Sequence, residues 1–83
     1  MPTVAIVDGV KIMVYTNEHP PAHFHAKYAE NQAVIDIESM TLTEGFLPTA
    51  QRRKVLEWAV TRKDKLLNAF AASRAHEKVE PIE

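Results

Sequence analysis

The chain has 83 residues, 46% of them hydrophobic and 25% charged, and a formal net charge of −1, which together predict one folded domain and exclude a disordered chain. The absence of cysteine excludes disulfides, thiolate zinc ligands and cysteine-based catalysis. No segment approaches the roughly 20 apolar residues of a membrane span, so we expect no membrane partner and a cytoplasmic location.

The first predicted element is a β-hairpin formed by residues 4–7 and 10–15, which are largely β-branched and apolar and flank the dipeptide Asp8-Gly9. Asp-Gly favours a two-residue turn because both residues tolerate positive φ. Such a turn places Val4 opposite Met13 and leaves apolar side chains on both faces of the sheet. One face can be covered by a helix, and the other is a candidate dimer surface.

A second hairpin is predicted from two segments with alternating polarity, residues 23–28 and 33–38. Their apolar side chains must share one face, so odd-numbered residues of one strand lie opposite even-numbered residues of the other. A turn centred on Glu30-Asn31 meets this condition. The resulting pairs are His25 with Asp36, His23 with Glu38 and Lys27 with Val34.

The rest of the chain predicts one long helix from Pro48 to about Arg74, because proline is favoured at the first helical position and apolar residues then recur at steps of three and four. Residues 39–46 either continue the fourth strand or form a short ribbon. We therefore expect an α+β fold, with a four-stranded antiparallel sheet of two consecutive hairpins followed by one long C-terminal helix. This single domain covers residues 1–74, and residues 75–83 form a charged C-terminal tail.

The predicted helix carries most of the positive charge: residues 48–74 hold seven basic and two acidic side chains, whereas residues 1–47 hold two and six. Such asymmetry can mark a surface for RNA or another polyanion, with Arg52 and Arg53 as candidate phosphate ligands at the helix start. The alternative is a solvated helix that complements its own acidic sheet or a second subunit. At about 40 Å the helix exceeds the width of the sheet, so it must overhang, bend or break.

Three histidines, His19, His23 and His25, lie within seven residues, and they are the most informative feature of the chain. Residues two apart on a strand point the same way, so His23 and His25 share a face with the carboxylates of the neighbouring strand. Together with Glu38, the three histidines are candidate ligands of a divalent metal, namely zinc, manganese or iron.

The same face suits two further chemistries. A histidine whose tautomer is set by a carboxylate can move a proton near neutral pH, so His23, His25, Asp36 and Glu38 are candidate catalytic groups. Lys27 is a candidate phosphate ligand beside them. The imidazoles and Lys27 can also bind a polyanion without turnover, and a purely structural role for the histidines stays open.

Several motifs run through the chain: Met-Pro-Thr at the start, His-Pro-Pro-Ala-His-Phe-His at residues 19–25, Ala-Val-Ile-Asp-Ile at residues 33–37, Leu-Pro at residues 47–48 and Leu-Glu-Trp-Ala at residues 56–59. In these motifs the chain resembles a bacterial family catalogued as domain of unknown function 4160, over about residues 1–72. The resemblance places the histidine motif of the family on His19, His23 and His25, and its acidic strand on Asp36 and Glu38. It implies a small operon-encoded protein beside a short protein partner, in the manner of toxin–antitoxin modules.

Three positions depart from the family pattern: Ala22 stands where a proline is common, Ala29 where a turn glycine is expected, and Arg62 where a helix histidine is common. A glycine at position 29 would indicate positive φ there, so Ala29 argues against a tight turn. A four-residue loop over residues 29–32 preserves the predicted register.

These observations lead to one hypothesis and two alternatives. The leading hypothesis is a toxin–antitoxin-like accessory protein that binds RNA, a nucleotide or a partner protein through the face carrying His23, His25, Asp36 and Glu38. The first alternative is a metal-dependent or acid–base phosphodiesterase that uses the same residues. The second is a protein whose helix and free sheet face serve homo-oligomerisation or partner docking, with structural histidines.

Overall fold

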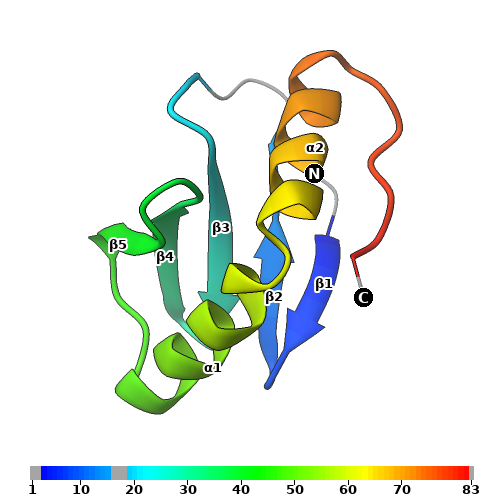
Figure 1. Cartoon of the computed structure of the whole chain (residues 1–83). Helices are drawn as coiled ribbons and strands as arrows, with labels where there is room; N and C mark the ends of the chain where they lie inside the picture. The colour runs from blue at the N-terminus through cyan, green and yellow to red at the C-terminus, as the bar shows by residue number, and fades with distance from the viewer. Residues whose placement is uncertain (1–2, 16–18, 83) are drawn as a thin grey trace.

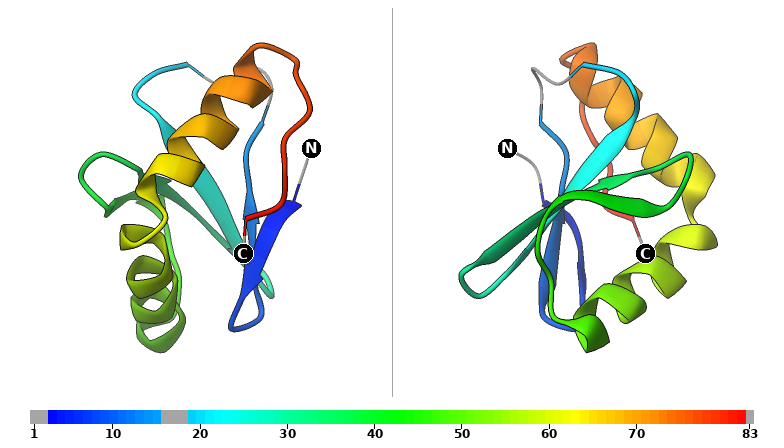
Figure 2. Two further views of the ribbon diagram at one scale, coloured as in Figure 1. Left: turned by 45° about the vertical axis from the view of Figure 1, so that its right-hand side comes forward. Right: turned by 90° about the vertical axis from the view of Figure 1, so that its left-hand side faces the viewer.

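The computed structural model of the chain describes residues 3–15 and 19–82. Within these residues, five strands form one antiparallel sheet in the order β1-β2-β3-β4-β5, and two helices cover one face of it (Figures 1 and 2). The elements are β1 (Thr3–Val7), β2 (Val10–Met13), β3 (His23–Tyr28), β4 (Asn31–Asp36), β5 (Thr41–Gly45), α1 (Thr49–Val60) and α2 (Lys63–Arg74). The expected four-stranded sheet followed by one long helix is therefore wrong in both parts.

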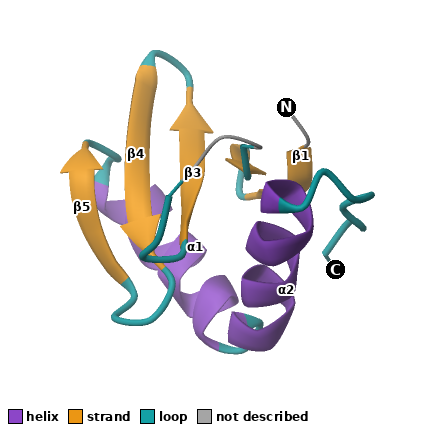
Figure 3. Cartoon of the chain, turned by 90° about the horizontal axis from the view of Figure 1, so that it is seen from above, coloured by secondary structure: helices purple, strands orange, loops and turns teal. Residues whose placement is uncertain are grey.

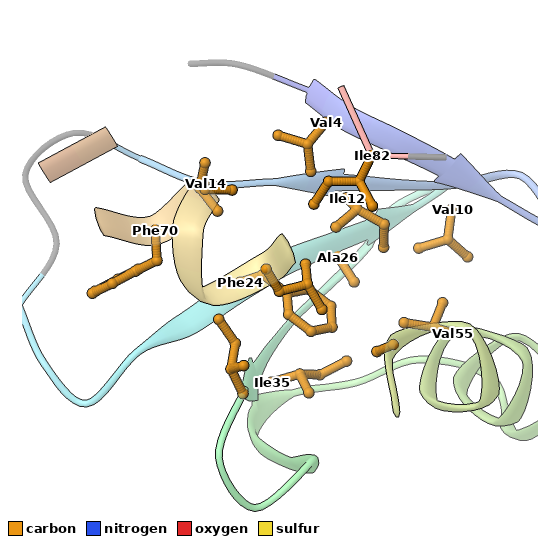
Figure 4. Close-up of a cluster of buried hydrophobic side chains, with 14 of the residues drawn as sticks. Val4, Val10, Ile12, Val14, Phe24, Ala26, Ile35, Val55, Phe70 and Ile82 are labelled. Atoms are coloured by element: carbon orange, nitrogen blue, oxygen red, sulfur yellow. The ribbon is translucent and has the colours of Figure 1, made fainter. Parts of the chain in front are cut away.

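The first hairpin turns at Asp8-Gly9, as predicted: Asp8 has a φ of 51°, Gly9 has a φ of 80°, and Val7 pairs with Val10. Nearer the start of β1 the register shifts, and Met13 pairs with Thr3 instead of the expected Val4. This bulge turns Val4 into the core, where only 2% of its surface is exposed (Figure 4).

The second hairpin turns one residue earlier than predicted, at Ala29-Glu30, with Tyr28 paired to Asn31. Ala29 itself adopts a φ of 53°, the conformation that was expected to require glycine. The expected register is consequently wrong by two residues, and the pairs are His23–Asp36, His25–Val34 and Lys27–Gln32. Because side chains alternate with a period of two, this displacement leaves the side chains of both strands on their predicted faces.

A fifth strand forms because β4 ends at Asp36 and the chain reverses. The Ser39 amide donates a hydrogen bond to Oδ1 of Asp36 at 2.9 Å, and the Met40 amide donates one to the Asp36 carbonyl at 2.8 Å. After this turn, in which Met40 has a φ of 56°, β5 pairs antiparallel with β4. Of the two alternatives for residues 39–46, continuation of the fourth strand is therefore wrong, and β5 forms a separate short strand.

The predicted single helix is broken at Thr61 and Arg62, between α1 and α2. Arg62 has a φ of −128°, and its amide donates to the Ala59 carbonyl at 2.9 Å. A straight helix of about 40 Å would exceed the longest dimension of the molecule, which is 33 Å. Seen from above, the two helices lie at an angle to each other (Figure 3), so each can bury its own apolar side chains on the sheet.

The core lies between the sheet and the helices (Figure 4). It contains Phe24 and Ile35 from the sheet, Val55 from α1 and Leu66 from α2, all fully buried. The segment after α2 adds Ile82, which is 7% exposed and whose amide donates to the Val4 carbonyl at 2.7 Å. In the part of the chain that the structure describes, neither helix has the length and apolarity needed to cross a membrane.

Candidate functional site

The sheet face opposite the helices carries the predicted polar residues. Phe24 and Ala26 of β3 point into the core and are fully buried, so the alternating His23, His25 and Lys27 point to the other face. Asp36 of β4 lies on that face too, directly opposite His23. The structure therefore keeps the imidazoles and one predicted carboxylate together, although in a different pairing.

Two adjoining hollows open on this face, with volumes of about 390 Å³ and 500 Å³. They share His25, Val34 and Glu44, which lie side by side on β3, β4 and β5. The first hollow is also lined by His19, Pro21, His23, Asp36 and Thr43, and the second by Tyr15, Gln32, Ala33 and Gly45. We refer to both together as the β4 groove, because Val34 of β4 contributes to each.

A row of aromatic rings forms one side of the β4 groove. The rings of Tyr15 and His25 meet edge to face, with centroids 4.3 Å apart and planes at 89°. The His23 ring follows at 5.4 Å from His25. On its other side His23 contacts the core, where Phe70 of α2 lies 5.3 Å away and does not line the groove. The Tyr15 hydroxyl accepts a long hydrogen bond of 3.5 Å from Nε2 of Gln32. The Tyr15 ring therefore lies over the sheet face that the helices leave uncovered, beside His25 and Gln32.

One imidazole of this row has a defined tautomer for its neutral form. Nδ1 of His23 is 2.8 Å from the Pro21 carbonyl oxygen. Because a carbonyl oxygen only accepts hydrogen bonds, Nδ1 must be the donor, and Nε2 is then the unprotonated nitrogen of the neutral ring. Pro21 therefore orients His23 as well as lining the groove.

Asp36 is held in its charged form by the turn that follows β4. The hydrogen bond from the Ser39 amide lowers the pKa of the Asp36 carboxyl below its usual value, and partial desolvation opposes this effect. The Ser39 side chain, the Glu38 amide and the charge of His23 lower the same pKa further. Asp36 therefore both accepts a hydrogen bond that closes the turn after β4 and lines the groove.

Other predicted site residues lie outside the β4 groove. Glu38 sits in the turn after β4, where its Oε2 is 3.5 Å from Nζ of Lys63, and the same ammonium donates to the Glu38 carbonyl at 3.1 Å. Lys27 lies farther along β3, opposite Gln32 on one side and Lys11 on the other. Arg52 and Arg53 belong to α1, in the helical layer on the other side of the sheet.

The metal-site hypothesis needs at least three ligands that converge. His19, His23 and His25 line the same hollow, but among residues 3–15 and 19–82 no group of three or more histidine, aspartate or glutamate side chains is placed to hold a metal ion. Glu38, the fourth predicted ligand, forms an ion pair with Lys63 and does not line the hollow of the three histidines. As placed, the described side chains of the groove do not converge on one point as the ligands of a metal centre do.

Sequence reasoning missed Tyr15, Gln32 and Glu44. Glu44 joins the groove because β5 pairs with β4 and places it opposite Val34. The alternation of Met40 and Leu42 was a signal for a strand, but it did not identify the neighbour of that strand. It also did not predict the register shift between Val34 and Ile35, which places Leu42 opposite the core residue Ile35 and Glu44 opposite Val34. Tyr15 continues the alternation of Lys11 and Met13, which could have placed it on the histidine face once β2 was paired with β3.

Comparison with known proteins adds one match. The family model described as Domain of unknown function (DUF4160) matches residues 9–71, a range that includes every lining residue of the β4 groove. No curated protein and no solved structure matches the chain.

Proposed function

The chain belongs to the family described as Domain of unknown function (DUF4160), and we propose that it is a binding module that holds a nucleotide or a short single-stranded RNA in the β4 groove. The observation that carries the proposal is the row of Tyr15, His25 and His23 rings beside an open polar hollow. Of the ligands that the sequence left open, RNA or a nucleotide suits these groups better than a protein surface does.

Aromatic rings on a sheet face are a general way to hold unpaired bases. A base stacked on an aromatic side chain contributes about 1–3 kcal/mol to binding, and the contact tolerates any sequence. Tyr15 and His25 are both half-buried, so their rings are held by neighbours yet retain exposed surface. Ordered rings cost less conformational entropy on binding than mobile ones.

Polar groups around the rings match the edges of a base. The carboxylates of Asp36 and Glu44 accept hydrogen bonds, as needed for the amino groups of cytosine, adenine or guanine. Gln32 offers an amide that can both donate and accept. The groove is thus better suited to the base of a nucleotide than to its phosphate, because two carboxylates would repel the phosphate.

A candidate phosphate site lies two residues farther along β2 and β3 than the Met13–His25 pair. Lys11 and Lys27 are direct cross-strand neighbours on the histidine face, at roughly 7 Å from the Met13–His25 pair by strand geometry. Like charges in this position are unfavourable, and neither ammonium forms an ion pair with a described residue. A bound phosphate would relieve that repulsion while its base occupies the groove.

The biological setting belongs to the same proposal and is supported by the family resemblance rather than by the site. We propose a bacterial, cytoplasmic accessory protein of toxin–antitoxin type, encoded beside a short protein partner. Within that setting, the β4 groove is the surface that engages RNA or a nucleotide.

The binding of a fluorescein-labelled, mixed-sequence single-stranded RNA, followed by fluorescence anisotropy, tests the proposal. Tyr15→Ala and His25→Ala should each weaken binding at least about tenfold, because each removes a stacking ring. Lys11→Ala with Lys27→Ala should weaken binding and flatten its dependence on salt. Lys65→Ala, an exposed lysine of α2, and His76→Asn, outside the groove, are matched controls. No binding by the folded wild-type protein, or equal losses in the controls, would contradict the proposal.

A second candidate function rests on one distance. The His23 and His25 rings are 5.4 Å apart, close enough for one imidazole to act as base and the other as acid on a phosphodiester, without a metal. Purified protein with a chelator should then cleave RNA with a bell-shaped pH profile, and His23→Ala or His25→Ala should abolish cleavage. If bound RNA stays intact over the whole pH range, this candidate is wrong and the binding function is unaffected.

A further inference from the structure

Two polar side chains lie close together on the β5 side of the β4 groove. Glu44 is opposite Val34 across the β4–β5 ladder, and Gln32 is two residues from Val34 on the same face of β4. Glu44 and Gln32 are therefore diagonal cross-strand neighbours, whose Cβ atoms lie within about 7–8 Å of each other. Both line the hollow of about 500 Å³, together with Tyr15 and His25. Their long side chains can thus reach the same edge of one ligand in that hollow.

Glu44 supplies the carboxylate that is available to a ligand. The residue is exposed, and among residues 3–15 and 19–82 its carboxylate forms no hydrogen bond or ion pair. Asp36, in contrast, already accepts the Ser39 amide at 2.9 Å and lies opposite His23. A carboxylate has two oxygens and can accept two parallel N–H groups at once. Glu44 therefore offers two adjacent acceptors to the hollow.

Gln32 supplies a donor beside these acceptors. Its Nε2 donates one N–H to the Tyr15 hydroxyl at 3.5 Å. An amide nitrogen carries two N–H groups, so the second can serve a ligand. The hollow thus combines one donor from Gln32 with two acceptors from Glu44, next to the rings that can stack on a base.

Of the four RNA bases, guanine alone has the complementary edge. Its O6 accepts a hydrogen bond, and its N1–H and 2-amino group are two adjacent donors. Adenine and cytosine each place one amino group beside a ring nitrogen that is an acceptor, which the second oxygen of a carboxylate repels. Uracil has a single N–H between two carbonyl groups and meets the same repulsion.

We infer that the β4 groove selects guanine: N1–H and the 2-amino group donate to the Glu44 carboxylate, and O6 accepts from Gln32. This inference rests on the proposed binding of a nucleotide or RNA, and it adds which base is held. Glu44 is then the residue that determines specificity, whereas the aromatic rings contribute affinity for any base.

The arrangement of the strands agrees with this orientation of the base. His25, Val34 and Glu44 lie side by side on three neighbouring strands, so His25 and Glu44 are about 10 Å apart across the shorter Val34. A purine lying over Val34 can contact the ring on one side and the carboxylate on the other. Its sugar is attached on the side away from the paired edge, and therefore points toward β3 and β2, the strands that carry Lys27 and Lys11.

Competition by nucleoside 5′-monophosphates against the fluorescein-labelled, mixed-sequence RNA tests the inference with the full chain. GMP should displace the RNA at a concentration at least about tenfold lower than AMP, CMP or UMP. Inosine monophosphate lacks only the 2-amino group of GMP. It should compete about tenfold less well than GMP, because one hydrogen bond to a charged acceptor is lost.

The variant Glu44→Gln should change the preference instead of only weakening binding. A carboxamide offers one acceptor and one donor, which matches the N1–H and the 2-carbonyl group of xanthine. Glu44→Gln should therefore lose its preference for GMP and bind xanthosine monophosphate better than GMP. Glu57→Gln, an exposed carboxyl of α1 outside the groove, is the matched control and should keep the preference for GMP.

Three results would overturn the inference. If the RNA binds but all four monophosphates compete equally, the guanine selectivity is wrong and the proposed binding function stands. If the preference for GMP survives in Glu44→Gln, another residue recognises the base. If the folded wild-type protein binds no RNA and no nucleotide, the inference and the proposed function are both wrong.

Discussion

His23 lies directly opposite Asp36 across the β3–β4 ladder, at the point where the sheet ends and the β4 groove begins. The same carboxylate accepts the Ser39 amide at 2.9 Å and so closes the turn toward β5. One aspartate thus connects the tight turn that creates the fifth strand with the imidazole that borders the groove.

The first prediction concerns the pH dependence of stability. The Ser39 amide, opposed by desolvation and aided by smaller effects that include His23, keeps the pKa of Asp36 below its usual value. A depressed carboxyl pKa stabilises the fold at pH values above the unfolded pKa of about 3.9, and this stabilisation is lost as pH falls through the folded pKa. Asp36→Asn should therefore lower the free energy of unfolding at pH 7 and have less effect near pH 3.

Urea unfolding of wild type and Asp36→Asn between these two pH values measures the difference. Glu80→Gln, an exposed carboxyl in the C-terminal segment, is the control and should follow the wild type. A deficit in Asp36→Asn that stays constant at every pH would contradict the prediction, because it would show that the charge of Asp36 contributes nothing.

The second prediction concerns the turn of the β3–β4 hairpin. Ala29 has a φ of 53°, which costs a residue with a Cβ roughly 1–2 kcal/mol, whereas glycine adopts it freely. After allowing for the greater freedom of glycine in the unfolded chain, Ala29→Gly should stabilise the protein by up to about 1 kcal/mol. Ala71→Gly, on the exposed side of α2, should instead destabilise it by about 1 kcal/mol in the same thermal melts. An equal loss of stability in Ala29→Gly and Ala71→Gly would show that the backbone of Ala29 is not strained.

The third prediction compares two glycines with the same φ of 80°, Gly9 and Gly45. A Cβ at Gly45 would collide with the Gln32 carbonyl oxygen of β4, whereas a Cβ at Gly9 would meet Cε1 of Tyr28 at an ordinary 3.4 Å. Gly9→Ala should cost about 1 kcal/mol of stability through backbone strain alone, and Gly45→Ala about 3 kcal/mol or more. Denaturant midpoints that rank the two variants in the opposite order would mean that β5 can shift away from β4 at little cost.

The fourth prediction concerns the break between the helices. Nη1 of Arg62 donates to the Trp58 carbonyl at 3.0 Å, and its guanidinium lies 5.3 Å from the centre of the Trp58 ring. Arg62→Ala should destabilise the protein by about 1 kcal/mol and shift the fluorescence of its single tryptophan to longer wavelength, because the ring becomes more exposed. Lys54→Ala, exposed on α1, should leave the emission unchanged. Unchanged emission in Arg62→Ala would rule out the contact between the guanidinium and the ring.

The β4 groove illustrates which parts of a site can be predicted from this sequence. The alternation of His23, His25 and Lys27 placed them on one face, and the structure bears this out. The partner residues were not predictable in the same way. Glu38, expected opposite His23, bonds to Lys63, while Glu44 and Tyr15 enter the groove from segments whose neighbours in space the alternation does not specify.

By itself, the sequence determined the first turn at Asp8-Gly9, the faces of β3 and β4 and the start of the helical region near Pro48. These features depend on local conformational preference and on a repeat of two or 3.6 residues, which are properties of short segments. The tertiary structure alone decided the register of β3 with β4, the pairing of β5 and the break at Arg62. Alternation is unchanged by a displacement of two residues, so only the strained turn at Ala29 and the packing of both helices on one small sheet select the arrangement that forms the groove.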